Sequence, residues 1–243
     1  MTGYSSIIGR ELTSSLEAMD HNIYLAGRTK SADFPHLKWL PWTLGQKLDV
    51  GNLPSMDVVI HLAWQTNSRR ENFHLNVGGS LQLLNEFEGK TSQIIFLSSL
   101  SALNPKSYYG LGKSTVEEYC ASKGIEVIRP GLILGGEKYS GRMRRAKFIP
   151  GGKTTVYITH LECLVSEITK TVSHVTKSSY NVVCEAVTLS KLVAKNSRYV
   201  PIPQWLAVVV LKAGSFILQI DDLKDAYISL ITTPKIESEY FIH

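Results

Sequence analysis

Short, almost continuously apolar runs alternate along the chain with longer stretches whose apolar residues recur at helical spacing. Such runs are typical of strands covered on both faces, and they predict strands over residues 23–26, 58–62, 94–98, 126–129 and 180–183. The helical spacing predicts helices over residues 8–19, 72–87, 112–122, 161–174 and 189–195. Strands that alternate with helices in this way indicate an α/β protein with a doubly wound parallel sheet.

The alternation loosens after residue 134, where glycine and proline residues become more frequent. We expect residues 1–134 to form the main domain and residues 135–243 a small C-terminal lobe, of which about 155–190 returns to the main sheet. The apolar stretch 205–220 is interrupted by Lys212 and is shorter than the roughly 20 apolar residues that a membrane-spanning helix needs. It predicts a buried helix and no membrane span, with shallow membrane contact as the alternative.

Composition narrows the class of protein. The 243 residues are 44% hydrophobic and 19% charged, which fits a globular protein and excludes disordered and collagen-like classes. The formal charge of +5 is small and scattered, so we expect no nucleic-acid partner, and an anionic small ligand suffices to explain it. The three cysteines lie far apart without metal-site spacing, so neither a structural disulfide nor a bound metal is expected. No segment resembles a secretory signal, and we expect a protein of the reducing cytoplasm.

A glycine-containing turn leads into the first predicted helix. The spacing of Gly3, Ser6 and Gly9 matches a turn that presents backbone N–H groups to a pyrophosphate in a Rossmann-like fold. Ser6 stands at the middle glycine position, where a side chain crowds the phosphates but also offers a hydroxyl donor. The alternative is an ordinary turn before a helix. The loop residues expected to bind a cofactor are Gly3, Ser6, Ile7, Ile8 and Gly9.

A Rossmann-like fold needs a strand directly before this loop, and here only Met1 precedes Thr2. That strand is central in the sheet, so its absence leaves its two neighbours either to pair directly or to expose unpaired backbone groups. We therefore expect the first strand to be missing from this sequence, through a misassigned start or a truncated chain. The alternative is a complete chain that is damaged as an enzyme.

The end of the second strand indicates which dinucleotide is bound. An NAD-selective site usually offers a carboxylate there, but Gly27 and Arg28 follow residues 23–26 in this chain. A guanidinium binds a 2′-phosphate well, and Lys30 adds a second cation close behind. These residues favour NADP over NAD, with a solvated loop arginine as the alternative.

Tyr109 and Lys113 are four residues apart at the start of a predicted helix, which places both on one face. A nearby ammonium stabilises the phenolate, so a tyrosine with an ordinary pKa of about 10 can move protons near neutral pH. The predicted strand 94–98 ends in Ser98 and Ser99, with Ser101 two positions on. A hydroxyl at that strand end can hydrogen-bond a substrate oxygen as charge develops on it. The alternative is an ordinary surface helix start.

Together these features resemble the extended short-chain dehydrogenases/reductases, in the NAD(P)-dependent epimerase/dehydratase group that mostly acts on nucleotide sugars. The resemblance covers nearly the whole chain. It rests on the turn, the strand, the helix, the Tyr–Lys pair and the later strand end at residues 2–9, 57–63, 76–80, 109–113 and 129–131. Segments 156–161 and 201–205 are similar to the substrate lobe of members from polysaccharide pathways.

The resemblance implies a role for each matching residue. Tyr109 would be the acid/base, Lys113 would bind the nicotinamide ribose and lower the Tyr109 pKa, and Ser99 would orient the sugar carbonyl or hydroxyl. Leu62 and Ala63 would line the cofactor, in an NAD(P)-binding domain over residues 1–134. The expected substrate-binding residues are Ser99, Ser101, Arg142 and Arg145.

Two of these assignments leave alternatives open. Arg142 and Arg145 belong to a basic cluster that could bind the diphosphate of a nucleotide sugar or could be a solvated loop. Trp64 follows the strand at 58–62, where the family usually has a small residue, so it either narrows the cofactor pocket or simply packs.

Several other polar residues are predicted to have structural or surface positions. His61, His160 and Asn76 are interpreted as structural residues that bind neither a metal nor a ligand. Glu117 and Glu118 are expected to face solvent or a neighbouring subunit.

Two hypotheses from different classes follow. The first is an NADP-dependent oxidoreductase or epimerase that acts on a nucleotide-linked sugar in polysaccharide biosynthesis, by 4-keto reduction or by epimerisation. The second is a non-catalytic dinucleotide-binding sensor or scaffold with a degenerate phosphate loop. Members of the family often pair through the helices that carry the Tyr–Lys pair, so the resemblance also implies a homodimer.

Overall fold

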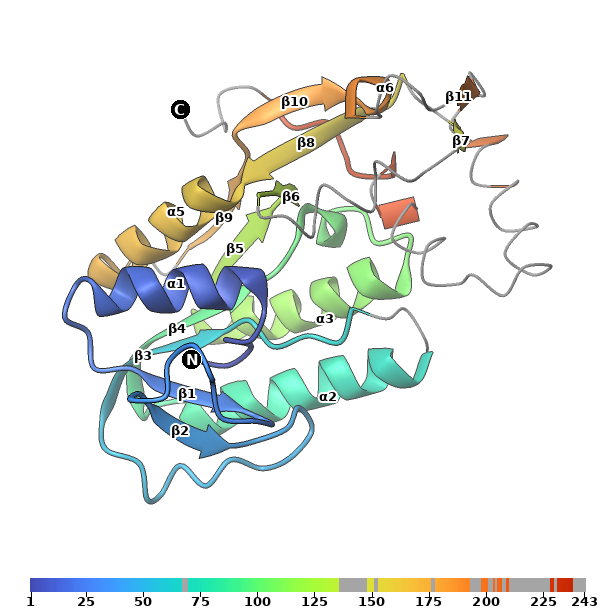
Figure 1. Ribbon diagram of the computed structural model, residues 1–243. Coiled ribbons are helices and arrows are strands. Elements are labelled where there is room, and N and C mark those ends of the chain that lie inside the picture. Colours follow the sequence, from blue (N-terminus) through green and yellow to red (C-terminus); the bar gives the residue numbers. More distant parts are fainter. Residues whose placement is uncertain are drawn as a thin grey trace.

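A parallel sheet covered by helices on both faces forms the main body of the protein in the computed structural model (Figure 1). The structure describes residues 1–66, 70–135, 148–150, 153–175, 178–192, 198–200, 203, 205–206, 209, 228–229 and 231–237. One helix pair covers each face of the sheet. These helices are α1 (Ile7–Glu17) and α5 (Leu161–Ser173) on one face, and α2 (Arg70–Phe87) and α3 (Tyr108–Lys123) on the other.

All strand pairs in the main sheet are parallel. A four-stranded part has the order β3 (Met56–His61), β4 (Thr91–Leu97), β5 (Glu126–Pro130) and β9 (Ser179–Val182). A second part pairs β1 (Tyr24–Gly27) with β2 (Lys38–Pro41). Parallel strands with helices on both faces confirm the predicted doubly wound α/β architecture.

The first two residues of the chain join these two parts. Thr2 forms single parallel bridges to Ala26 of β1 and to His61 of β3. The Thr2 N–H donates to Ile60 O at 3.0 Å, and the Ala26 N–H donates to Met1 O at 2.8 Å. Met1 and Thr2 therefore hold the central place expected for the first strand, between β1 and β3.

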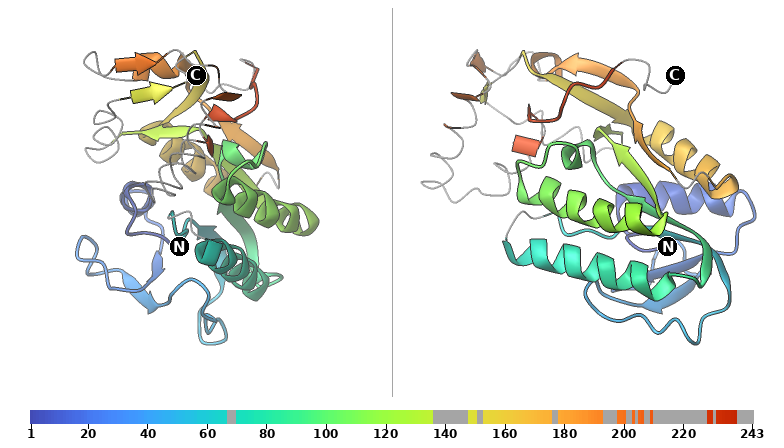
Figure 2. Two further views of the ribbon diagram at one scale, coloured as in Figure 1. Left: turned by 90° about the vertical axis from the view of Figure 1, so that its right-hand side faces the viewer. Right: turned by 180° about the vertical axis from the view of Figure 1, so that it is seen from behind.

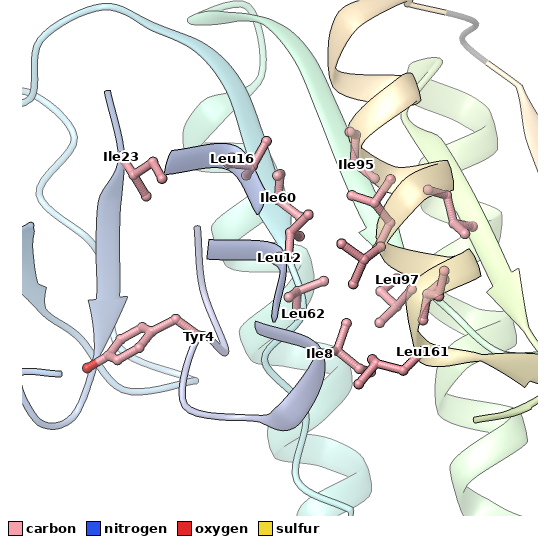
Figure 3. Close-up of a cluster of buried hydrophobic side chains, with 14 of the residues drawn as sticks. Tyr4, Ile8, Leu12, Leu16, Ile23, Ile60, Leu62, Ile95, Leu97 and Leu161 are labelled. Carbon is pink, nitrogen blue, oxygen red and sulfur yellow. The ribbon is translucent and has the colours of Figure 1, made fainter. Parts of the chain in front are cut away.

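Alternate residues of the central strands face opposite helix pairs. Ile60 and Leu62 pack against Leu12 and other apolar residues of α1 and α5, in the buried cluster shown in Figure 3. Val59 faces the other way and belongs to a second cluster beneath α2 and α3. Both faces of β3 and β4 are thus apolar, which explains why these strands are continuous apolar runs in the sequence.

The remaining strands lie beyond the carboxyl ends of the main sheet, where Figure 1 shows them at the top. A small mixed sheet has the order β10 (Glu185–Thr188), β8 (Thr155–His160), β6 (Leu132–Leu134), and β7 (Phe148–Pro150) pairs with β11 (Arg198–Val200). The C-terminal segment contacts this region, because the Ile236 N–H donates to the Tyr157 hydroxyl at 2.7 Å. A short helix, α6 (Leu189–Leu192), follows β10.

Several predicted boundaries were wrong or incomplete. Helix α3 begins at Tyr108, four residues before the predicted start at Gly112, because the Ser107 hydroxyl caps it by accepting from the Gly110 N–H. The sequence patterns did not predict the 3₁₀ helix η1 (Leu100–Ala102), or the strands β2, β6, β7, β8, β10 and β11. The helix predicted over 189–195 is described only to Leu192.

The apolar stretch 205–220 lies almost entirely outside the described residues. Of its members that are described, Trp205 is 68% exposed and Val209 is 53% exposed, so these two are not the buried residues that were expected. Among the helices that the structure describes, none is long and apolar enough to cross a membrane.

Candidate active site

The predicted phosphate loop folds tightly against the end of β3. Gly3 has a φ of +72°, and a Cβ placed there would lie 2.6 Å from the Ala63 backbone nitrogen. A Cβ on Gly9 would lie 2.5 Å from Gly3 O. Both positions therefore need glycine, as the spacing of the loop predicts. These contacts bring together Gly3, Gly9, Leu62 and Ala63, four of the residues expected to line a cofactor.

Ser6 is the N-cap of α1. Its hydroxyl accepts from the Gly9 N–H at 3.0 Å and donates to Gly3 O at 2.9 Å. Both hydrogen bonds of the Ser6 hydroxyl are therefore made within the loop. In this way the loop accommodates a serine at the middle glycine position. The N–H groups of Ile7 and Ile8 are in the first helical turn, where they have no intrahelical acceptor. They are the donors that this turn can offer to an anion, next to the positive end of the helix dipole.

Tyr4, which the sequence analysis did not single out, links this loop to the end of β1. Its side chain is buried, and its hydroxyl donates to the Thr29 carbonyl oxygen. The ring lies so close to Gly27 that a Cβ there would meet it at 2.6 Å. Arg28 is exposed between these two contacts. The structure therefore places the turn that carries Arg28 beside the predicted phosphate loop. The sequence signal for this contact is Tyr4, an aromatic residue inside the loop.

The Tyr–Lys pair lies on the first turns of α3. Tyr109 is half-buried, whereas Lys113 is only 3% exposed. The Lys113 ammonium donates to Leu97 O of β4 at 2.6 Å, so it reaches under the carboxyl end of the sheet. Both residues contact Trp64. The Tyr109 and Trp64 rings are edge to face with centroids 6.2 Å apart, and Lys113 Nζ lies 3.8 Å from the Trp64 ring centroid.

Ser99 and Ser101 lie next to the start of α3. Ser99 is the N-cap of η1, and its hydroxyl accepts from the Ser101 N–H at 3.3 Å. A Cβ on Gly110 would lie 2.5 Å from Ser101 O, so η1 packs directly against the turn that carries Tyr109. The structure thus brings Ser99 and Ser101 to the same edge of the sheet as Tyr109 and Lys113. Arg142 and Arg145 lie outside the described residues.

Burial governs the electrostatics of Lys113. Desolvation lowers the pKa of its ammonium to about 7, and the nearby negative charge of Glu117 partly opposes this shift. Glu117 is not at the surface, which corrects the expectation that it faces solvent or another subunit. Its carboxylate binds the Arg129 guanidinium through two nitrogens, with an Nη2 to Oε2 distance of 2.7 Å, and its side chain is 10% exposed. Glu118 is exposed.

The predicted structural residues are placed as expected. The buried His61 ring lies between Thr2 Oγ1 at 2.8 Å and Ser80 Oγ at 2.9 Å. Asn76 accepts from the Gln65 N–H at 2.7 Å and donates to Gln65 O at 2.9 Å, which fixes the backbone after Trp64. His160 is the N-cap of α5 by position, without a capping side-chain hydrogen bond, and its exposed Nε2 lies 3.4 Å from a carboxylate oxygen of Glu185. Among the described residues, no group of three His, Cys, Asp or Glu side chains could hold a metal ion.

The predicted cofactor and catalytic residues thus gather at the carboxyl ends of β1, β3 and β4. In doubly wound sheets ligands bind outside this edge, where the chain crosses from one face to the other. Figure 2 shows α1 and α2 on opposite sides of the sheet. Because α1 follows Thr2 and α2 follows β3, the chain changes direction between Thr2 and β3, which are bridged to each other.

Solved structures with this fold are known. Neither a protein-family model nor a curated protein sequence matches the chain. MoeE5 in complex with UDP-glucose and NAD superposes with a TM-score of 0.70 at 19% identity, over 83% of this chain and 84% of that one. UDP-glucose 4-epimerase of Thermotoga maritima with UDP-glucose gives 0.66 at 19% identity, over 84% and 85%. The NAD-dependent NDP-hexosamine 5,6-dehydratase TunA gives 0.66 at 15% identity, over 86% and 89%.

These similarities establish the fold. The chain shares the fold of these three proteins, and this fold is the one that the resemblance described above implies.

Proposed function

We propose that this chain is an NADP-dependent enzyme that reduces a 4-keto group of a nucleotide-linked sugar or epimerises the sugar through a 4-keto intermediate. The observation that carries the proposal is the placement of Tyr109 and Lys113 on one face of α3, next to η1 with Ser99 and across Trp64 from the phosphate loop. Three structures of this fold that carry nucleotide sugars or act on them support the substrate class.

The residues at this edge fit a nicotinamide dinucleotide. Ile7 and Ile8 offer backbone donors at the start of α1 for the pyrophosphate. Arg28 is exposed beside the same loop and makes no ion pair with another described residue, so its guanidinium can bind a 2′-phosphate. The MoeE5 structure carries NAD, and we base the choice of NADP on Arg28 and on the absence of a carboxylate at the end of β1.

A bound nicotinamide dinucleotide would supply the hydride donor or acceptor. Tyr109 would exchange a proton with the sugar oxygen that becomes, or ceases to be, a carbonyl. The Lys113 ammonium, one helical turn away, would favour the phenolate form of Tyr109. The Ser99 hydroxyl would hydrogen-bond the same oxygen and hold it near Tyr109. Arg142 and Arg145 remain our candidates for the sugar-nucleotide diphosphate.

A second candidate is a non-catalytic dinucleotide-binding protein. The observation that favours it is the burial of Lys113 beneath Trp64, because an ammonium that an indole ring covers cannot bind the nicotinamide ribose. Both hypotheses predict that the chain binds a dinucleotide. Only the enzyme hypothesis predicts turnover of a nucleotide sugar.

The cofactor is tested by isothermal titration calorimetry with NADPH and NADH. We expect NADPH to bind more tightly than NADH, and Arg28→Ala to weaken NADPH binding by about tenfold while leaving NADH binding nearly unchanged. Lys90→Ala is the matched control, because Lys90 is exposed at the opposite edge of the sheet, just before β4. Equal affinity for the two dinucleotides would contradict the NADP preference, and no binding of either would contradict the proposed function.

Three further assignments belong to the same proposal. We place the protein in the cytoplasm, which fits the three free cysteines. We infer a role in polysaccharide biosynthesis from the resemblance of its lobe segments. We also infer a homodimer through α2 and α3, where Tyr108 and Leu111 are large exposed residues of α3. Light scattering of the purified chain measures the mass that decides this last point.

A further inference from the structure

The Lys113 ammonium is enclosed by protein groups on every side that the structure describes. It donates to Leu97 O at 2.6 Å, lies 4.6 Å from the Phe96 ring centroid and 3.8 Å from the Trp64 ring centroid, and is 3% exposed. Leu97 and Phe96 belong to the buried central strand β4. Trp64 is the neighbour that lies outside a strand and is half-buried. Of these three neighbours, Trp64 is therefore the one whose movement would open the ammonium to a ligand oxygen.

Ring contacts stabilise the Trp64 side chain in its position, whereas an indole N–H left unpaired within the described part of the chain disfavours that position. Its ring packs on Gly112, where a Cβ would lie 3.1 Å from Trp64 Cζ2, and it meets the Tyr109 ring edge to face. A buried cation over an indole face is stabilising. However, the Trp64 Nε1–H is buried without a hydrogen-bond partner among the described residues. An orphaned buried donor costs about 1–3 kcal/mol, so the present position is not a fully satisfied one.

The backbone beside Trp64 is fixed. Both hydrogen bonds of the Asn76 amide go to the Gln65 backbone, and Ala63 packs on Gly3. A change in the position of the indole would therefore be a rotation of the side chain, with the loop backbone left in place.

Resting on the proposed function, we propose that Trp64 is a positioning residue for Lys113: it covers the ammonium and must turn away before Lys113 can contact a dinucleotide. Rotation would expose the ammonium and bring the indole N–H to water or to a ligand acceptor. It would also return Lys113 toward water, where the ordinary pKa of a lysine is 10.5 instead of about 7. Uncovering therefore restores the charged form that stabilises the Tyr109 phenolate.

The test is acetylation of Lys113 by acetic anhydride in the full chain, followed by mass spectrometry of its peptide from about pH 6 to about pH 10.5. In the wild-type chain we expect buried Lys113 to react slowly relative to the exposed Lys90. Trp64→Ala should raise the plateau rate at Lys113 by at least about tenfold and move the midpoint of its pH profile upward by about one unit or more. Trp64→Phe keeps an aromatic face and should remain close to wild type. Trp205→Ala, which removes an exposed tryptophan, is the matched control and should change neither quantity.

An unchanged plateau and an unchanged midpoint in Trp64→Ala, with a native circular dichroism spectrum, would overturn the proposal. Trp64→Leu removes the aromatic face but keeps apolar bulk, and its profile decides the question if Trp64→Ala does not fold. Calorimetry with NADPH on the same variants separates this proposal from the proposed function. Tighter NADPH binding by Trp64→Ala would support the proposal that Trp64 covers Lys113. If the acetylation rates change as expected but neither the wild-type chain nor the variants bind a dinucleotide, only the proposed function is contradicted.

Discussion

His61 shows how a single buried side chain couples this fold to pH. Its ring is fully buried between Thr2 and Ser80, and it stacks on Phe96 with centroids 5.8 Å apart. Burial, with smaller contributions from the Lys113 ammonium and the N-terminal amine, lowers the pKa of the imidazole from 6.5 to about 3. The ring is therefore neutral in the native state at all but strongly acidic pH.

We expect this burial to make the free energy of unfolding fall as the pH decreases from 6.5 to about 3. In that range the unfolded chain binds a proton at His61 and the native chain does not, so stability is lost at up to about 1.4 kcal/mol per pH unit. Above pH 6.5 this contribution is constant. Urea unfolding of wild type and His61→Gln at several pH values measures the slope, with the exposed His74→Gln as control. A slope that is the same in all three proteins would contradict this account.

Lys113 is the residue on which stability and function oppose each other. Burying its ammonium disfavours the charged form, which under the proposed function would stabilise the Tyr109 phenolate, and the Trp64 ring and Leu97 O compensate only in part. Local compromises of this kind are typical of functional sites in otherwise consistent folds.

At the scale of single elements, the phosphate loop is built by close approach of backbone to backbone. Gly3 and the unrelated turn residue Gly89 have nearly the same φ, +72° and +70°, but only Gly3 has neighbours that a Cβ would meet. Substituting each glycine by alanine therefore distinguishes two contributions to the loss of stability. Gly89 measures the backbone strain of a left-handed conformation, and Gly3 adds the clash with Ala63.

We expect Gly3→Ala to destabilise the protein by clearly more than the roughly 1 kcal/mol that backbone strain alone costs, and Gly89→Ala to show that smaller effect. Gly3→Ala should also weaken NADPH binding, because the loop must shift away from the end of β3. Thermal unfolding and calorimetry measure the two effects. Equal destabilisation by both substitutions would show that Ala63 does not confine the loop.

Helix α3 is attached to β5 by the paired Glu117 and Arg129 side chains, which are 10% and 16% exposed. Removing one member of a buried pair leaves the other charge without a partner, so we expect Glu117→Ala to cost about 3 kcal/mol. Glu118→Ala, at an exposed position on the same helix, should be nearly neutral. Chemical denaturation of both variants measures the difference, and a similar small change in each would show that the pair is not stabilising.

The central strands and their helices could be predicted from local patterns, and the reasons are visible in particular residues. Val59 and Ile60 face opposite helix pairs, so the strand appears as an unbroken apolar run. Helix α3 was predicted four residues short because Tyr108 and Tyr109 lie on its half-exposed first turn, and only the Ser107 cap marks its true start. The strand β2 is Lys-Trp-Leu-Pro, and its pairing with β1 decides its conformation more than its own pattern does.

The candidate site was predictable where one short segment carries the chemistry. The Tyr109–Lys113 spacing and the Gly3–Gly9 loop are of this kind. The contact of Trp64 with Lys113 joins residues from two different elements, and no local pattern specifies it.

At the scale of the whole molecule, the C-terminal segment reaches the main sheet beside the candidate site. The Asn104 amide donates to Thr232 O at 2.7 Å, and the Ser107 and Ser229 hydroxyls lie 2.5 Å apart. Residues from the C-terminal segment therefore contact both the η1 region and the cap of α3. Because Ser99 and Tyr109 lie on these same elements, the C-terminal segment helps to fix the geometry in which they would meet a sugar.

The most direct test of the central claim is turnover by the purified chain with a dinucleotide and a nucleotide sugar. We expect either consumption of NADPH with a UDP-linked 4-keto sugar or conversion of UDP-glucose to its C4 epimer. Tyr109→Phe, which lacks the phenolic proton, should reduce that rate by at least about a hundredfold. Tyr108→Phe, at the neighbouring exposed position, should retain it. Full activity in Tyr109→Phe, or no turnover by the wild-type chain that binds NADPH, would contradict the account and favour the non-catalytic binding protein.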